Sequence, residues 1–119
     1  IEVRSFGFRN GIPIDADIVM DVRFLPNPYF IEELKEKTGS DKEIRAFLQG
    51  YENYVDFVKR FRDLLSYILP LYKKEGRSYL NIAIGCTGGK HRSVAVAEEI
   101  YDVIQSSGFN CKLIHRDIA

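Results

Sequence analysis

Three successive patterns between residues 79 and 104 constrain the fold more than any other part of the chain. Residues 79–84 form an apolar run that is typical of a buried strand. A glycine-rich stretch follows at 85–93. From 94 to 104, apolar side chains recur at three- and four-residue steps, as they do on one face of a helix. A strand that passes through a tight loop into a helix is the building unit of α/β proteins, so the sequence predicts that class.

Further strands are predicted on either side of this unit. Residues 1–8 alternate between apolar and polar side chains, residues 18–22 form a short apolar run, and residues 111–114 form a last one. Strands that alternate with helices favour a parallel sheet. We therefore expect a single compact domain over residues 1–119, with a mostly parallel sheet of about four strands flanked by helices.

Two more helices are expected between the second and third strands. Ser40 opens a short helical segment that ends at Gly50. Residues 52–72 predict a long amphipathic helix, which Pro70 should kink or end near its last turn. The aromatic residues at helical spacing are expected in the core rather than on a platform that stacks bases: Tyr51, Tyr54, Phe57, Phe61 and Tyr67.

The balance of charge limits the classes of partner. Lys and Arg together number 17, and Asp and Glu also number 17, so the net charge is zero. Nucleic-acid-binding proteins often carry a basic excess, so any basic surface here must be local. Two cysteines are too few for a secreted disulfide framework, and no apolar run approaches the roughly 20 residues that span a bilayer. These features predict a cytoplasmic protein that does not contact a membrane.

The loop at 85–93 has the composition of an anion-binding site. Adjacent glycines allow backbone N–H groups to converge on one point, and the N-terminus of the following helix adds positive potential. A lysine adds charge, and an arginine can hold a phosphate through two parallel hydrogen bonds. We expect a phosphate group to bind to Cys86, Thr87, Gly88, Gly89, Lys90, His91, Arg92 and Ser93.

Other polar residues follow the remaining predicted strands. Asp21 and Arg23 stand at the end of the second strand, and His115 and Arg116 stand at the end of the last one. Ligands of parallel sheets bind at the carboxyl ends of the strands, so these segments are expected to meet at one rim. A histidine there can donate to a ligand or transfer a proton near neutral pH, and the alternative for His91 and His115 is an exposed position without a role.

Cys86 and Arg92 are separated by five residues, which is the spacing of cysteine-dependent phosphatases. In such a site the thiolate lies at the base of the loop as the nucleophile, while the arginine holds the phosphate oxygens. These enzymes usually have a histidine before the cysteine, where this chain has Gly85. They also need an acid that protonates the leaving group, for which Asp21 and Asp117 are the candidates. A phosphatase is therefore the alternative to a site that binds phosphate without turnover.

The same stretch does not satisfy the pattern of an ATP-binding P-loop. Gly89 and Lys90 match the end of that pattern, but His91 stands where it has a serine or threonine, and Ile84 stands at its first glycine. Two histidines and two dispersed cysteines give no metal-ligand spacing. We expect neither a cofactor nor a metal.

Three segments together resemble one protein family. They are residues 5–17, residues 21–28 and the loop at 85–93, and residues 115–117 fit the end of the same domain. Over nearly its full length the chain resembles the C-terminal domain of the RapZ/YvcJ family of RNase adapter proteins. In that family an N-terminal domain carries a Walker-type nucleotide site, which we do not expect in this chain.

The resemblance implies a regulatory binding domain rather than an enzyme. It implies that the loop at 86–93 holds the phosphate of glucosamine-6-phosphate. On the same basis, four further residues line the pocket: Asp21, Arg23, Ser78 and Tyr79.

The resemblance also implies that the domain binds a small regulatory RNA, which the family presents to an endoribonuclease. Enterobacterial members have a histidine, linked to RNA recognition, where this chain has Tyr29. Sugar phosphate and RNA would then compete for one rim, and association into a homo-oligomer is also expected. The residues assigned to RNA on this basis are Lys90, His91, Arg92, His115, Arg116 and Tyr29.

Overall fold

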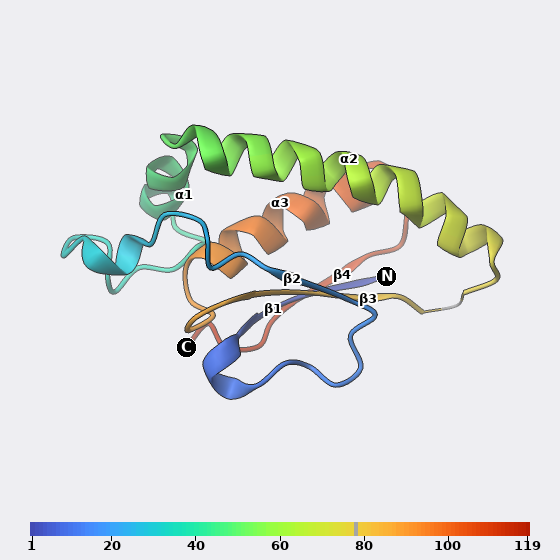
Figure 1. Cartoon of the computed structure of the whole chain (residues 1–119), viewed down its shortest axis with the longest axis horizontal. Helices are drawn as coiled ribbons and strands as arrows, with labels where there is room; N and C mark the ends of the chain where they lie inside the picture. Colours follow the sequence, from blue (N-terminus) through green and yellow to red (C-terminus); the bar gives the residue numbers. More distant parts are fainter. Residues whose placement is uncertain (78) are drawn as a thin grey trace.

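The computed structural model describes residues 1–77 and 79–119, in which strands and helices form one α/β domain (Figure 1). In this part of the chain, four strands build one sheet. The strands are β1 (Glu2–Gly7), β2 (Ile18–Asp21), β3 (Asn81–Cys86) and β4 (Lys112–His115). The helices are α1 (Lys42–Gln49), α2 (Glu52–Lys74) and α3 (Arg92–Ser106). Of these, α3 packs on the sheet, and α1 and α2 pack on α3 and on each other.

The sheet is parallel throughout its described strands, with the order β2-β3-β1-β4. The prediction of a parallel α/β sheet is therefore confirmed. Because all strands run in the same direction, the segments that leave them start at a single edge. At this edge the paired Cα positions are Gly7 with Cys86, Gly85 with Asp21, and Ser5 with His115.

The helices gather on one side of the sheet, and the core lies between them and the strands (Figure 1). α3 packs directly on β1 and β3, and α2 packs on α3. The buried face of α2 follows three- and four-residue steps, at Tyr54, Val58, Phe61, Leu65 and Leu69. This packing fixes the N-terminus of α3 directly behind the loop that follows β3.

The path of α2 differs from the expectation at Pro70, because the helix runs on to Lys74. Proline lacks the N–H that would bond to the carbonyl of Ser66, four residues earlier. Both residues are exposed, so water can satisfy that carbonyl and the helix continues. Neither α2 nor any other helix in the described part of the chain is long and apolar enough to cross a membrane.

The aromatic residues along α2 divide into two groups. Tyr54 and Phe61 are buried in the core, as predicted, and Phe57 is partly buried against it. Tyr51 and Tyr67 are 45% and 71% exposed, so the prediction that they lie in the core is wrong. Helical spacing indicated a common face, but it did not show how wide the buried part of that face is.

Two neighbouring leucines test this assignment of the faces of α2. Leu65 is 1% exposed, whereas Leu64 is 48% exposed. Leu65→Ala is expected to lower the free energy of unfolding by about 2–5 kcal/mol, because the truncation leaves a cavity in a packed core. Leu64→Ala is the matched control and should cost about 1 kcal/mol or less. Urea unfolding measures both, and equal losses would contradict the assignment.

Candidate functional site

The loop between β3 and α3 is folded tightly against the end of β1. Cys86 ends β3, and Arg92 begins α3. Gly89 has a φ of +81°, and a β-carbon there would lie 2.6 Å from the backbone nitrogen of Gly7. A β-carbon on Gly7 would lie 2.5 Å from the carbonyl carbon of Gly88. Side chains at these positions would clash with backbone, so glycine is what allows the loop to close over the edge of the sheet.

Cys86 forms the floor of this loop. Its residue is 3% exposed, and its Sγ lies 3.1 Å from Ser93 Oγ. The N–H of Gly89 donates to the same sulfur at 3.3 Å. Two neighbours can thus donate hydrogen bonds to the sulfur, which is the arrangement that a nucleophilic thiol needs.

Arg92 reaches from the first turn of α3 back across the loop, and its residue is only 5% exposed. Its Nη1 donates to the carbonyl oxygens of Arg23, at 2.7 Å, and Leu25, at 3.1 Å. Its Nη2 lies 3.4 Å from Thr87 Oγ1. Among the described residues, its Nε has no hydrogen-bond partner. Burial lowers the pKa of this guanidinium, although the group stays far from neutral pH.

The edge formed by Nε and Nη2 of Arg92 thus keeps an unused donor, although its Nε is buried from solvent. Bidentate pairs of arginine with phosphate use two such parallel donors. Backbone donors stand beside this edge, because the N–H groups of Thr87, Gly88, Lys90 and His91 donate no hydrogen bond to another described residue. The N-terminus of α3 adds positive potential at the same place. The loop, the helix and the arginine together supply the donors that a phosphate requires.

The end of β2 forms one side of the rim. Arg23 donates from Nε to both carboxylate oxygens of Asp21, at 2.9 and 3.1 Å, and from Nη2 at 2.6 Å. Its guanidinium also lies 3.9 Å from the centre of the Phe8 ring. The hydrogen bonds from Arg23 hold the pKa of the Asp21 carboxyl below its usual range. Asp21 and Arg23 thus lie beside the loop, with their charges turned toward each other.

The end of β4 supports the loop from another side. The Oδ2 of Asp117 accepts hydrogen bonds from the N–H of Gly7 at 2.7 Å and from Arg116 Nη2 at 2.8 Å. Burial opposes ionisation of Asp117, but the hydrogen bonds from Arg116 and Gly7 outweigh it and hold its pKa below the usual range. Arg116 also donates to the carbonyl of Gly11 at 2.7 Å. Asp117 therefore joins the ends of β4 and β1 below the loop.

His115 points away from the rim, toward α3. Its Nδ1 lies 2.6 Å from Ser5 Oγ, and its Nε2 lies 3.1 Å from a carboxylate oxygen of Glu98. Glu98 also accepts hydrogen bonds from Arg45 and Ser40. Both ring nitrogens are thus engaged inside the domain, which corrects the expectation that His115 faces RNA. Neighbouring residues of a strand point to opposite faces of the sheet, so His115 could not share the orientation of the residue after it.

These elements enclose a pocket of about 550 Å³ at the carboxyl edge of the sheet. In the described part of the chain, no group of three or more His, Cys, Asp or Glu residues could hold a metal ion. The residues named from the sequence that line the pocket are Cys86, Thr87, Gly88, Lys90, His91, Arg92, Asp117 and Tyr29. Asp21 and Arg23 are not among its lining residues, because their side chains pair with each other beside the loop, which corrects the expectation that they line the pocket. Lining residues that the sequence reasoning missed include Arg9, Asn27, Phe30, Lys35 and Glu36.

A segment before α1 closes one side of this pocket. The N–H of Gly39 donates to the carbonyl of Lys90 at 2.9 Å, and His91 Nε2 lies 3.1 Å from the carbonyl of Lys35. Lys90 Nζ pairs with a carboxylate oxygen of Glu36 at 3.6 Å. His91 is buried, and burial lowers the pKa of its imidazole. His91 therefore serves as an internal support of the loop rather than as an exposed contact.

The chain as a whole is similar to known proteins. A family model described as the RapZ C-terminal domain matches residues 1–119. The chain belongs to this family. The match confirms the resemblance that the sequence motifs indicated, and it covers the loop, the rim and the supporting segment together.

Curated relatives of this RapZ C-terminal domain are longer proteins. A nucleotide-binding protein of Citrifermentans bemidjiense is 51% identical over 118 residues, and one of Clostridium beijerinckii is 50% identical over 119 residues. These alignments cover 99% and 100% of the chain, but only 41% and 40% of the respective relatives. The chain therefore spans about two fifths of the length of the relatives it matches.

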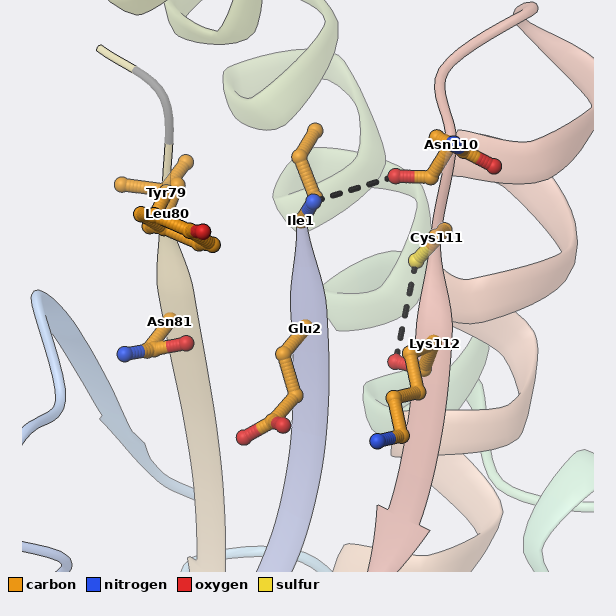
Figure 2. A pocket seen from close by; sticks show the side chains of 8 residues that line it. All are labelled: Ile1, Glu2, Tyr79, Leu80, Asn81, Asn110, Cys111 and Lys112. Atoms are coloured by element: carbon orange, nitrogen blue, oxygen red, sulfur yellow. Dashed lines mark hydrogen bonds between the residues drawn. The ribbon is translucent and has the colours of Figure 1, made fainter.

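Tyr79 lies outside the loop pocket of this RapZ C-terminal domain. It precedes β3, whereas Cys86 ends β3, so a six-residue strand separates them. Figure 2 shows Tyr79 at the amino-terminal edge of the sheet, beside a different pocket of about 420 Å³ that Ile1 and Asn110 also line. This placement corrects the expectation that Tyr79 lines the phosphate pocket. Ser78, which we assigned to the same pocket, lies outside the described residues.

The burial of His91 predicts a pH dependence of stability for the RapZ C-terminal domain. Since burial lowers its pKa from 6.5 in the folded state, the unfolded chain binds a proton more readily. The contribution of His91 to stability is therefore complete above about pH 6.5 and is lost as the pH falls toward the folded pKa. His91→Gln can still donate to the carbonyl of Lys35 but cannot titrate.

Wild type is expected to lose more stability than His91→Gln when the pH is lowered from about 7.5 to 5.5. Urea unfolding of both proteins at the two pH values measures this difference. An equal loss in both proteins would show that His91 does not titrate differently in the folded and unfolded states.

Proposed function

We propose that this domain is a regulatory sensor that binds glucosamine-6-phosphate, with the phosphate in the loop at 86–93. The observation that carries this proposal is the buried guanidinium of Arg92, whose Nη1 is tied to two carbonyl oxygens while its Nε has no partner among the described residues. A buried donor without an acceptor costs about 1–3 kcal/mol, and more when it is charged. A phosphate oxygen at this edge would remove that cost.

The surroundings of Arg92 suit a dianion. Backbone N–H groups of the loop and the N-terminus of α3 supply donors that do not depend on side-chain flexibility. Lys90 adds a positive charge at the pocket wall, where its pairing with the exposed Glu36 leaves it in reach of solvent. A phosphate would thus replace weak solvent contacts with several charge-assisted hydrogen bonds.

The pocket beyond the loop can accept the sugar. Its volume of about 550 Å³ lies in the usual range for small-molecule sites. Tyr29 and Phe30 offer apolar surface at its mouth, and they are 51% and 79% exposed. Glu36 and Asp117 are carboxylates that line the pocket and can accept hydrogen bonds from an amino group. The choice of this amino-sugar phosphate rests on the family resemblance.

Binding without turnover is favoured by the state of the candidate acids. A phosphatase needs a protonated group that donates to the leaving oxygen. Asp21 and Asp117 are both held ionised by neighbouring arginines, with pKa values below the usual range. The contacts around the sulfur of Cys86 favour the alternative, a cysteine-dependent phosphatase, because they suit a nucleophile. That alternative lacks a proton donor among these two residues.

RNA is the second proposed ligand, and the endoribonuclease to which the family presents RNA is a proposed partner. Arg9, Lys35 and Lys90 line the same pocket, so several cations gather at the loop although the chain is neutral overall. The exposed rings of Tyr29 and Phe30 lie beside these cations and can stack on bases. We assign this binding to the cytoplasm, where sugar phosphates and RNA would compete for one rim.

The first test is a calorimetric titration with glucosamine-6-phosphate. Arg92→Lys keeps the charge but loses the bidentate donor edge, so it should weaken binding about tenfold or more, as the loss of one charge-assisted hydrogen bond worth roughly 1.5–3 kcal/mol requires. Arg60→Ala on the exposed face of α2 is the matched control and should bind as wild type does.

Two results would contradict the proposed sensor. Unchanged affinity in Arg92→Lys, or no binding heat in wild type, would remove the loop as the phosphate site. Steady turnover of an aryl phosphate by wild type that vanishes in Cys86→Ser would favour the phosphatase instead.

The second test concerns RNA and uses a fluorescein-labelled RNA stem–loop. Its affinity should fall steeply with salt and should fall further when glucosamine-6-phosphate is added, because both ligands need the same cations. Lys90→Ala should weaken RNA binding and reduce the salt dependence, whereas Lys59→Ala on α2 should not. Fluorescence anisotropy measures each case. Binding that ignores salt and the sugar phosphate would contradict a shared rim.

A further inference from the structure

Cys86 has no task in phosphate binding that an inert side chain could not perform. Yet its sulfur receives the N–H of Gly89 at 3.3 Å and lies 3.1 Å from Ser93 Oγ. The residue also lines the pocket, although only 3% of its surface is exposed. Hydrogen bonds to sulfur and a nearby cation are the surroundings of reactive rather than structural cysteines.

Arg92 supplies an independent observation at the same place. The residue is 5% exposed, its Nη2 lies 3.4 Å from Thr87 Oγ1 in the loop, and its Nε has no partner among the described residues. Electrostatic attraction between Arg92 and Cys86 favours the charged form of the arginine. A buried cation with an unused donor thus lies in the same loop as the sulfur.

We propose that Cys86 is an oxidation site at which a peroxide converts the thiol to a sulfenic acid. The deprotonated sulfur attacks one oxygen of the peroxide, a sulfur–oxygen bond forms as the oxygen–oxygen bond breaks, and the second oxygen leaves as hydroxide or alkoxide, which takes up a proton. The sulfur is oxidised and the peroxide is reduced. Arg92 stabilises the negative charge that develops on the leaving oxygen.

The second cysteine differs in each of these respects. Cys111 is partly buried, its sulfur has only a 3.9 Å contact with the carbonyl of Lys112, and burial raises the pKa of its thiol. It stands at the amino-terminal edge of the sheet (Figure 2), whereas Cys86 stands at the carboxyl edge. Cys111 therefore cannot form a disulfide with Cys86, and an external thiol is needed to reduce the sulfenic acid.

Oxidation would regulate the site that we propose for glucosamine-6-phosphate, and this step rests on that proposed function. The oxygen added to Cys86 lies at the floor of the loop, where a phosphate oxygen would otherwise be held. The oxidised domain therefore loses the sugar phosphate until a thiol reductant restores it. A bound phosphate, in turn, shields the sulfur from peroxide.

The test treats the wild-type chain with hydrogen peroxide in the presence of a 1,3-dione that traps sulfenic acids, followed by peptide mass spectrometry. Labelling of Cys86 is expected to be at least about tenfold faster than that of Cys111, because hydrogen-bond donors and a buried cation stand around the sulfur of Cys86 and not around that of Cys111. Ser93→Ala should slow the labelling of Cys86, since the sulfur loses one donor. Ser66→Ala, which removes an exposed hydroxyl on α2, is the matched control.

The outcomes separate this inference from the proposed function. Equal or faster labelling of Cys111, or no labelling of Cys86, would overturn the oxidation site even if glucosamine-6-phosphate binds. Selective labelling of Cys86 that glucosamine-6-phosphate does not slow would uphold the oxidation site and contradict the proposed ligand. Selective labelling that the sugar phosphate slows, and that a thiol reverses together with recovery of binding, supports both.

Discussion

The buried guanidinium of Arg92 joins the parts on which the candidate site depends. Arg92 is the first residue of α3, and its side chain crosses the loop after β3. The guanidinium donates to the carbonyl oxygens of Arg23 and Leu25, which follow β2. A charged group in so little solvent has to be held by such acceptors, because an uncompensated buried charge is strongly destabilising. Its Nη1 is thus used for structure and its Nη2 lies beside Thr87, so the fold holds the guanidinium in place, with a buried Nε that has no partner among the described residues.

The acidic side chains at the carboxyl edge of the sheet are paired with arginines. Arg23 balances the negative charge of Asp21, and Arg116 balances that of Asp117. Both carboxylates can therefore stay ionised beside a site for an anion. The cations that remain for a ligand come from the loop and from the segment before α1. The site therefore offers positive potential locally, while the chain as a whole carries no net charge.

Hydrophobic periodicity was enough to predict the class of fold and the positions of the strands and helices. The rule that parallel strands end at one edge also predicted that Asp21 and Arg23 would meet the loop. It would equally have indicated Arg9, which follows β1 at the same edge. Lys35 and Glu36 reach the pocket through a segment without a repeating pattern, so no sequence rule could have placed them there.

The errors have physical causes of the same kind. His115 belongs to the last strand, and the alternation of side chains turns it to the helical face. Tyr79 was assigned from the resemblance alone, although a residue that precedes β3 cannot reach the end of β3. Pro70 was expected to disturb α2, but Ser66 and Pro70 are both exposed, so water can satisfy the carbonyl that the proline leaves without a partner. These cases depended on how exposed each residue is and on where its side chain points within its strand or helix. Neither property can be read from the spacing of residues in the sequence.

The contact between Gly7 and the backbone of Gly88 has a consequence for how such domains can diverge. The two residues are distant in the sequence, and Gly7 does not line the pocket. A side chain at Gly7 would push the loop away from β1, so the shape of the pocket depends on a position that a ligand would never touch. Drift of the sequence is thus limited at Gly7 by the geometry of the backbone alone.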